Sequence, residues 1–249
     1  MEKVALVTGA RHRLGEAIAR HLIDHGWQVH AHVRQADDAV PDGASKVVAD
    51  LAEPDCGEAI FSQIDGAPPA LLVNNASLFE EDRFGSIDAE GFARQMAVNA
   101  RAPMLLTDAF ARAAAPVGVD RSIVNMGDAK LAAPHSDHLS YTLTKGALKT
   151  LTEVSARALA GQGIRVNMIA PAMVLPSPGM SDAQYAAMHP FNPLGRGVEV
   201  EHVLSALDHL IGNKVVTGTC LWLDGGQRMM QLENDVALIQ KDDVSEEDA

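Results

Sequence analysis

The sequence contains little cysteine, and this scarcity restricts the metal and disulfide chemistry that the chain can support. Cys56 and Cys220, the two cysteines in 249 residues, lie too far apart to match a metal-ligand spacing, and they fit a reducing compartment. Two histidine pairs have metal-like spacing but lack the further ligands of a site: His30 with His32, and His135 with His138. We therefore predict no metal centre.

Long apolar runs and positive charge are also lacking. No run reaches the length of a membrane span, and the N-terminal MEKVALVTGA, with an acidic second residue, is unlike a signal peptide. We expect a cytoplasmic protein with no membrane partner. The 20 Lys and Arg against 33 Asp and Glu give a net charge of −13, which argues against nucleic acid as a partner. Part of that charge falls in residues 239–249, which we expect to form a flexible acidic tail after one domain at 1–238.

What the chain does contain is a regular alternation of short apolar runs with segments of helical spacing. Strands are expected at residues 4–8, 27–33, 46–49, 70–73, 122–126, 164–169 and 221–223, and helices at 14–24, 88–98, 100–114, 140–160 and 199–211. This alternation is typical of βαβ units, which predicts an α/β fold: a single Rossmann-type domain with a doubly wound parallel sheet and helices on both faces. Ligands of such sheets bind at the carboxyl ends of the strands. The least regular stretch, 176–195, holds four of the twelve prolines and has the composition of a lid or substrate loop.

The motif TGARHRLG at residues 8–15 joins the first strand to the first helix. Gly9 permits a tight turn, Gly15 lets the helix pack closely on the strand, and the exposed amides at the helix N-terminus suit a pyrophosphate. The spacing is not G-x-G-x-x-G, so on this motif alone an ordinary strand–turn–helix connection is equally compatible. Arg11, His12 and Arg13 add positive charge to the loop, although a solvated loop would also carry such residues.

Arg34 follows the second strand, where the ribose 2′ position of a bound dinucleotide would lie. An acidic residue there favours NAD, whereas an arginine accommodates the 2′-phosphate of NADP. His32 lies nearby and either assists or is an ordinary strand residue. The loop therefore favours NADP.

Tyr141 and Lys145 are four residues apart and share one face of a helix. A neighbouring ammonium group lowers the pKa of a phenol and makes it able to exchange protons near neutral pH. The spacing alone is also common in ordinary amphipathic helices. Asp128 follows an apolar run thirteen residues before Tyr141, where it either takes part in chemistry or caps the turn at 126–130.

Together these motifs resemble the short-chain dehydrogenase/reductase family over nearly the whole chain. The matching features are TG-x₅-G at 8–15, Asp50-Leu51, NNA at 74–76, Asn99 in VNA, Y-x-x-x-K at 141–145, Pro171, and TG…LDGG at 217–226. The resemblance implies a Rossmann fold, a nicotinamide cofactor and a homotetramer.

Three departures from the usual family pattern are similar to one branch of the family. Arg13 stands where a third glycine is usual, Asp128 where a serine is usual, and Ser77-x-Phe79 follows NNA. Combined with TGA-x-x-RLG, H-x-R after the second strand, NM-x-D and Y-x-x-x-KGAL, they resemble the pteridine reductases. The bacterial dihydromonapterin reductases are similar in plan.

The resemblance implies a role for each candidate residue. Asp128, Tyr141 and Lys145 would supply a proton, and Asn99 would fix a helix distortion near Lys145. Phe79 would stack on a pterin ring, although core packing is an equal alternative from the sequence alone. The implied substrate contacts are Arg13, Ser77, Phe79, Asp128 and Tyr141. The implied cofactor contacts are Gly9, Arg11, His12, Arg13, Leu14, Gly15, His32, Arg34, Asp50, Leu51, Asn75, Ala76, Ser77, Met126, Tyr141, Lys145, Pro171 and Met173.

These roles predict an NADPH-dependent reduction of a pterin, by hydride transfer to a ring C=N bond with proton supply from the Asp-Tyr-Lys set. The pterin would be of the dihydropterin, biopterin, dihydromonapterin or dihydrofolate type. The alternative enzyme is a carbonyl reductase acting on a ketone or a 3-oxoacyl thioester, against which Asp128 and the Ser77/Phe79 pair count. A cofactor-sensing binding protein would have no need for Tyr141 and Lys145.

Overall fold

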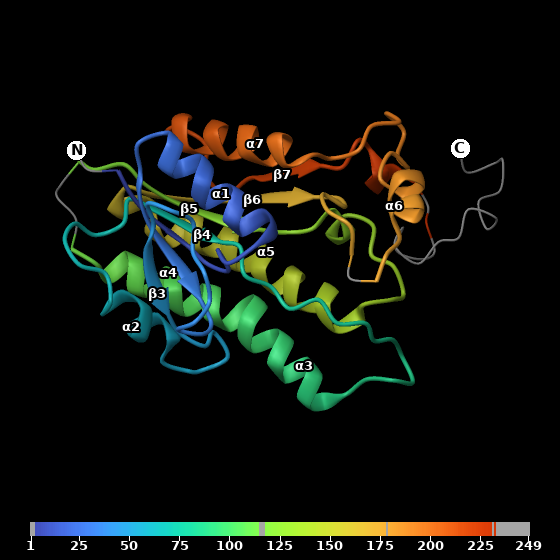
Figure 1. Ribbon diagram of the computed structural model, residues 1–249, viewed down its shortest axis with the longest axis horizontal. Helices are drawn as coiled ribbons and strands as arrows, with labels where there is room; N and C mark the ends of the chain where they lie inside the picture. Colours follow the sequence, from blue (N-terminus) through green and yellow to red (C-terminus); the bar gives the residue numbers. More distant parts are fainter. Residues whose placement is uncertain (1–2, 115–117, 178, 231, 233–249) are drawn as a thin grey trace.

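The computed structural model describes residues 3–114, 118–177, 179–230 and 232, and in this part of the chain seven parallel strands form one sheet (Figure 1). The strand order is β3-β2-β1-β4-β5-β6-β7, so the sheet is wound outward in both directions from the β1/β4 pair, as predicted. The strands are β1 (Val4–Val7), β2 (Gln28–Val33), β3 (Ser45–Val48), β4 (Leu71–Asn74), β5 (Arg121–Met126), β6 (Ile164–Pro171) and β7 (Cys220–Leu223).

Helices cover both faces of this sheet (Figure 1). On one face lie α1 (Arg13–Asp24) and α7 (Val200–Gly212); on the other lie α2 (Cys56–Phe61), α4 (Ala102–Arg112) and α5 (Leu139–Leu159). α3 (Ala89–Met96) packs beside α5, and a π-helical turn at Ala97–Arg101 joins it to α4. In the described part of the chain, no helix is both long enough and apolar enough to cross a bilayer.

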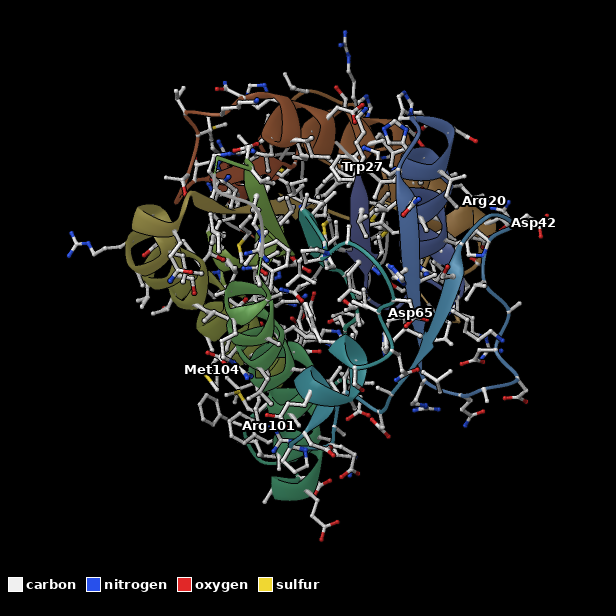
Figure 2. All side chains as sticks on the ribbon, turned by 90° about the vertical axis from the view of Figure 1, so that its left-hand side faces the viewer. Arg20, Trp27, Asp42, Asp65, Arg101 and Met104 are labelled. Carbon is white, nitrogen blue, oxygen red and sulfur yellow. The ribbon has the colours of Figure 1, made fainter. Side chains whose placement is uncertain are left out.

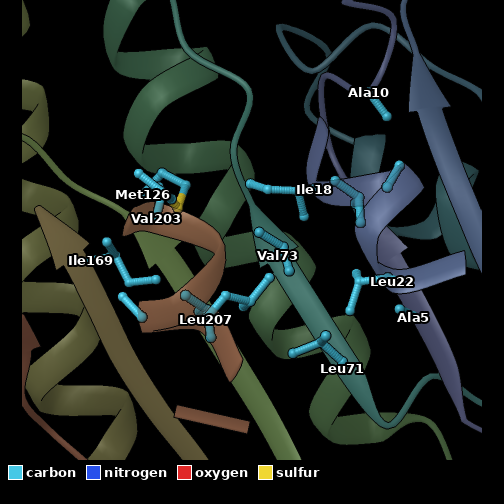
Figure 3. Close-up of a cluster of buried hydrophobic side chains, with 14 of the residues drawn as sticks. Ala5, Ala10, Ile18, Leu22, Leu71, Val73, Met126, Ile169, Val203 and Leu207 are labelled. Carbon is cyan, nitrogen blue, oxygen red and sulfur yellow. The ribbon is translucent and has the colours of Figure 1, made fainter. Parts of the chain in front are cut away.

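The alternation of side chains along the strands divides the core into two layers. Ala5 and Val7 pack with α1 and α7, whereas Leu6 between them packs with α2 and α4 on the opposite face. In the first layer, Ile18 of α1 and Leu207 of α7 contact the sheet (Figure 3). Because both faces are buried, the strands read as continuous apolar runs, and for this reason they could be recognised in the sequence.

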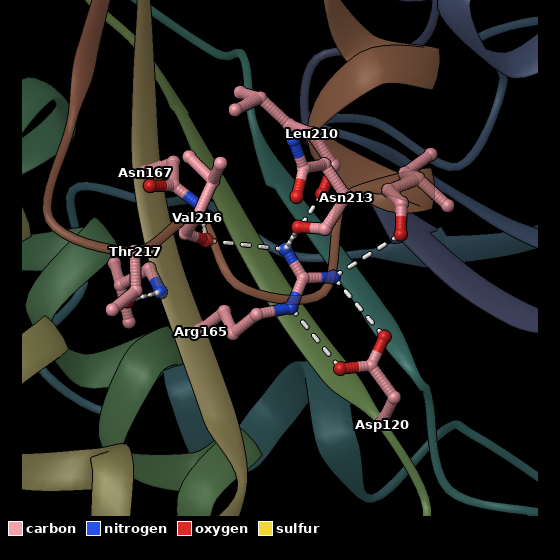
Figure 4. A network of polar contacts seen from close by, with 9 residues as sticks. Asp120, Arg165, Asn167, Leu210, Asn213, Val216 and Thr217 are labelled. Atoms are coloured by element: carbon pink, nitrogen blue, oxygen red, sulfur yellow. Dashed lines mark hydrogen bonds and ion pairs between the residues drawn. The ribbon is translucent and has the colours of Figure 1, made fainter.

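A polar network fixes the edge of the sheet opposite the carboxyl ends of the strands (Figure 4). The Arg165 guanidinium donates to both carboxylate oxygens of Asp120, at 3.0 and 3.1 Å, and to the carbonyl oxygens of Leu210 and Asn213 at the end of α7. These carbonyls have no partner within the helix, so the arginine satisfies them and complements the helix dipole. The network ties α7 to the start of β6.

Two helices were not predicted. α2 has six residues, too few for a periodic pattern to be recognised, and α6 (Asp182–Met188) lies within the stretch expected to be irregular. α6 begins where the Ser181 side chain accepts a hydrogen bond from the Gln184 amide at 3.2 Å, and Tyr185 anchors it by donating to the Val174 carbonyl at 2.9 Å. The predicted acidic tail at 239–249 lies outside the described residues.

Candidate active site

Two adjoining cavities lie at the carboxyl ends of the strands, as the fold predicts. One, of about 520 Å³, is lined by the loop after β1 and the end of β2, and the other, of about 460 Å³, by the ends of β5 and β6 and by α5. Arg13, Leu14, Asn75 and Ser77 line both. The two cavities therefore form one continuous site along the edge of the sheet where the strand order reverses.

The loop at 8–15 needs both of its glycines. Gly9 has a φ of +66°, and a Cβ atom there would lie 2.9 Å from the Ala76 Cα atom. A Cβ atom on Gly15 would lie 2.1 Å from the Gly9 carbonyl oxygen. The backbone of α1 thus approaches the strand more closely than any other residue type permits, which leaves the helix N-terminus open to the cavity. This cradle fits the pyrophosphate of a dinucleotide.

His32 supports this loop through both nitrogens of its ring. The Gly9 amide donates to Nδ1 at 3.2 Å, so Nδ1 is unprotonated, and Nε2 donates to the Ala49 carbonyl at 3.0 Å. Burial lowers the pKa of His32, which favours the neutral ring that this arrangement requires. His32 borders the cavity, but it holds the phosphate loop and presents no charge to a ligand.

Arginines surround the outer end of the larger cavity. Arg34 is exposed after β2, and Arg11 reaches across the opening to Asp38, with 2.7 Å between Arg11 Nη1 and Asp38 Oδ1. The Asp38 side chain is 6% exposed, and it also accepts a hydrogen bond from the Gln35 amide at 3.0 Å. Asp38 was not predicted as part of the site. It holds Arg11 in place, so that two guanidinium groups border the position predicted for a 2′-phosphate.

The smaller cavity contains the predicted acid and tyrosine in direct contact. Asp128 Oδ2 accepts a hydrogen bond from the Tyr141 hydroxyl at 2.7 Å, and Asp128 Oδ1 accepts one from the Lys130 amide at 2.8 Å. The chain must pass close to β6 here, because a Cβ atom on Gly127 would lie 2.6 Å from Met168 Sδ. The turn cap, which was one of the two alternatives for Asp128, is therefore present, and the same carboxylate also contacts the tyrosine.

Lys145 lies one helical turn beyond Tyr141 on α5, and its side chain is buried. Its Nζ atom donates to the Met126 carbonyl at 2.8 Å and lies 5.5 Å from the centroid of the Tyr141 ring. Burial lowers the pKa of Lys145 to about 8, against the opposing influence of the Asp128 carboxylate. The ammonium group is thus able to release its proton within a unit or so of neutral pH.

Asn99 lies behind the cavity wall, in the π-helical turn between α3 and α4. Its Oδ1 atom accepts from the Leu78 amide at 2.7 Å, and its Nδ2 atom donates to the Leu78 carbonyl at 2.8 Å and to Thr144 Oγ1 at 3.0 Å. The helix distortion predicted at Asn99 is present. Asn99 joins the segment after β4 to α5, one residue before Lys145, and it does not line either cavity.

Phe79 forms an aromatic wall beside Tyr141. Its ring meets the Tyr141 ring edge to face at 4.7 Å, and it stacks on the His138 ring at 4.1 Å. Phe79 remains 40% exposed and lines the smaller cavity. It is therefore not a core-packing residue, which was the alternative left open by the sequence.

The predicted site residues other than Asn99 all line the cavities. Those of the larger cavity are Gly9, Arg11, His12, Arg13, Leu14, Gly15, His32, Arg34, Asp50, Leu51, Asn75, Ala76 and Ser77. Those of the smaller cavity are Arg13, Leu14, Asn75, Ser77, Phe79, Met126, Asp128, Tyr141, Lys145, Pro171 and Met173.

Other polar residues of the site were not among those predicted from the sequence. Lys130, His135 and Arg228 line the smaller cavity, and Lys130 Nζ lies 2.5 Å from Asp137 Oδ1 in an ion pair whose side chains are 3% and 6% exposed. Among the described residues, no group of three or more His, Cys, Asp or Glu side chains is arranged to bind a metal.

Comparisons with known proteins agree with this geometry. The family model described as enoyl-(acyl carrier protein) reductase matches residues 9–228. L-xylulose reductase from Bos taurus is 36% identical over 234 residues, covering 89% of this chain and 95% of that protein. Pteridine reductase 1 from Leishmania tarentolae is 32% identical over 277 residues, covering 90% of this chain and 95% of that protein.

A solved structure extends the comparison to three dimensions. FolM alternative dihydrofolate reductase 1 from Brucella canis, complexed with NADP, superimposes with a TM-score of 0.82 at 32% identity, covering 91% of this chain and 94% of that chain. The fold of this chain is thus matched over most of its length. The chain belongs to the short-chain dehydrogenase/reductase family of oxidoreductases.

Proposed function

We propose that the protein is an NADPH-dependent reductase of a pterin, of the dihydropterin, biopterin, dihydromonapterin or dihydrofolate type. The single observation that carries this proposal is the 2.7 Å hydrogen bond from the Tyr141 hydroxyl to Asp128, at the position where the family usually has a serine. A serine hydroxyl orients a carbonyl oxygen. A carboxyl group paired with the tyrosine suits a ring nitrogen that must receive a proton as the neighbouring carbon is reduced.

NADPH is the cofactor of this reaction and, when bound, supplies the hydride. The residues available to hold it are the glycines of the phosphate loop, with Arg11 and Arg34 for the 2′-phosphate and Lys145 for the nicotinamide ribose. The NADP complex of the Brucella canis relative supports this assignment.

Proton supply is the task of the Asp128–Tyr141–Lys145 set. The Tyr141 hydroxyl donates its proton to the substrate nitrogen, and the nearby Lys145 ammonium favours the phenolate that results. Asp128 accepts the hydroxyl hydrogen bond before the transfer. After the transfer the Asp128 carboxylate takes a proton from solvent and passes it to the Tyr141 phenolate, which restores the starting state. The hydride at carbon and the proton at nitrogen together account for the reduction of one C=N bond.

Phe79, Ser77 and Arg13 complete the substrate site. The ring of Phe79 is a flat surface against which a pterin stacks, and offset aromatic pairs contribute about 0.5–1.5 kcal/mol beyond simple area burial. Ser77 is exposed to both cavities, and Arg13 Nη2 donates to the Pro176 carbonyl at 2.9 Å, so Arg13 connects the phosphate loop with the segment after β6.

A second candidate function is reduction of a carbonyl group, and the 36% identity to L-xylulose reductase favours it. In that case Asp128 would act as a substitute hydrogen-bonding group for the usual serine. The two functions differ in their substrate, because a sugar offers no flat ring for Phe79 and no ring nitrogen for Tyr141.

We also propose that the protein is a cytoplasmic homotetramer. Free cysteines at Cys56 and Cys220 suit a reducing compartment. Met104 on α4 is an exposed apolar residue (Figure 2). Leu143 and Val154 on α5 are exposed as well, and all three are available for subunit contacts. Light scattering of the purified protein measures the number of subunits directly.

The function is tested by following NADPH oxidation with three substrates: dihydrobiopterin, L-xylulose and an acetoacetyl thioester. Turnover of the dihydropterin at the highest kcat/KM supports the proposal, and turnover of only the sugar or the thioester overturns it. The variant Tyr141→Phe should bind NADPH normally and lose at least a hundredfold in kcat. Normal turnover by this variant would contradict the proton-supply mechanism.

A further inference from the structure

His138, immediately before α5, is held in an unusual conformation. Its φ of +48° is one of two positive values among the non-glycine residues of the described chain, and the residue is 5% exposed. A left-handed backbone is unfavourable for a residue with a Cβ atom, so it persists only where the surrounding contacts require it. Contacts of His138 with its surroundings must therefore stabilise this backbone conformation.

The contacts of His138 lead directly to Phe79. The two rings stack with 4.1 Å between centroids and 17° between planes, and His138 Nδ1 donates to the Glu80 carbonyl at 3.3 Å. One face of the Phe79 ring is thus covered by the histidine. Because Phe79 is still 40% exposed and lines the cavity, its remaining surface is available to a ligand.

Asp82 fastens the same two segments a few residues further on. Its carboxylate accepts hydrogen bonds from the Ser140 amide at 2.9 Å and from the Ser140 hydroxyl, and its carbonyl accepts one from the Leu139 amide at 3.2 Å. These bonds satisfy free amides at the start of α5. The segment 79–82 and the first turn of α5, which carries Tyr141, are consequently joined as one unit (Figure 1).

We propose that His138 is a positioning residue that holds the Phe79 ring at a fixed distance and orientation from Tyr141. The inference rests on the proposed function, because a flat heteroaromatic substrate is what a fixed ring of this kind would recognise. Holding the ring before the substrate arrives removes the loss of side-chain freedom that binding would otherwise require. His138 thereby raises affinity for a flat ring without touching the reacting atoms.

Two variants separate the ring of His138 from its backbone. Asparagine tolerates the left-handed conformation but has no aromatic ring, whereas phenylalanine keeps a stacking ring. In His138→Asn, the KM for dihydrobiopterin should rise about tenfold, with kcat and the KM for NADPH changed less than about twofold. His138→Phe should restore the KM. The matched control is His25→Asn, which removes an exposed histidine whose ring lies 4.2 Å from the His21 ring at an interplanar angle of 39°. His25 lines neither cavity, so this variant should change nothing.

A measurement without substrate keeps this inference separate from the proposed function. In protein labelled with fluorophenylalanine, the fluorine signal of Phe79, assigned with Phe79→Leu, should shift and broaden in His138→Asn and stay unchanged in the control His25→Asn. An unchanged signal overturns the positioning role. If the wild type does not reduce dihydrobiopterin, the proposed function fails, and the fluorine spectra alone decide the role of His138. An unchanged KM for dihydrobiopterin in His138→Asn, or a joint loss of kcat and NADPH affinity, also overturns the positioning role of His138.

Discussion

Replacing Lys145 by methionine should remove a pH dependence of stability that the wild type shows. Burial lowers the pKa of Lys145 from its ordinary value of 10.5 to about 8 in the folded protein. The unfolded chain therefore binds this proton more tightly than the folded chain does. Between about pH 8 and pH 10.5 the unfolded state is protonated and the folded state is not, so the free energy of unfolding rises with pH.

The size of the effect follows from the pKa shift. Each pH unit within this window is equivalent to about 1.4 kcal/mol, so from pH 8 to pH 9.5 the wild type should gain about 2 kcal/mol relative to Lys145→Met. Below pH 8 both states hold the proton and the difference between the two proteins should be constant. Groups that titrate identically in both proteins cancel in the comparison.

Urea-induced unfolding of both proteins at half-unit steps from pH 7 to pH 9.5 measures this difference. The free energy of unfolding of the wild type, relative to that of Lys145→Met, should fall progressively as the pH falls from 9.5 to 8. Stability curves that run parallel across the whole range would show that Lys145 keeps an ordinary pKa. The proton-supply role proposed for it would then lose its electrostatic basis.

Two further predictions concern the parts of the site that bind charge. Lys130→Met leaves the buried Asp137 carboxylate without its ammonium partner, which should lower the free energy of unfolding by about 3–5 kcal/mol. The double variant with Asp137→Leu should recover most of this loss. Equal losses in the single and double variants, measured by urea unfolding, would contradict a buried ion pair. Arg34→Ala should raise the KM for NADPH roughly tenfold and leave the KM for NADH unchanged, because only NADPH has a 2′-phosphate. Steady-state kinetics with both cofactors measure the two KM values. Equal increases in both KM values would place Arg34 outside the 2′-phosphate site.

The strands of the sheet and the long helices could be predicted because the pattern that marks each of them lies in adjacent residues. Each buried strand forms a short apolar run, and α1, α5 and α7 carry apolar residues at helical spacing, so their positions could be inferred from adjacent residues. α2 and α6 were missed because six or seven residues span fewer than two helical turns. The stability of such short helices comes from contacts such as the bond from Tyr185 to Val174, which no local pattern reveals.

The site was predictable where a motif fixes the geometry. Gly9, Gly15, Tyr141 and Lys145 lie where the strand-turn-helix pattern and the helical spacing put them. Contacts between distant segments were not predictable. The pairing of Arg11 with Asp38 depends on how two loops fold over one strand end, and the stacking of His138 on Phe79 joins residues 59 positions apart.

The proposed function requires that Asp128 adapts the site to a ring C=N bond. The most direct test is the ratio of kcat/KM for dihydrobiopterin to that for L-xylulose, in the wild type and in Asp128→Ser, which has the residue usual in the family. We predict a ratio in favour of the pterin for the wild type and a fall of at least a hundredfold in Asp128→Ser, with sugar reduction unchanged or increased. An unchanged ratio in the variant would show that Asp128 acts only as a turn cap and an ordinary hydrogen-bond partner of Tyr141.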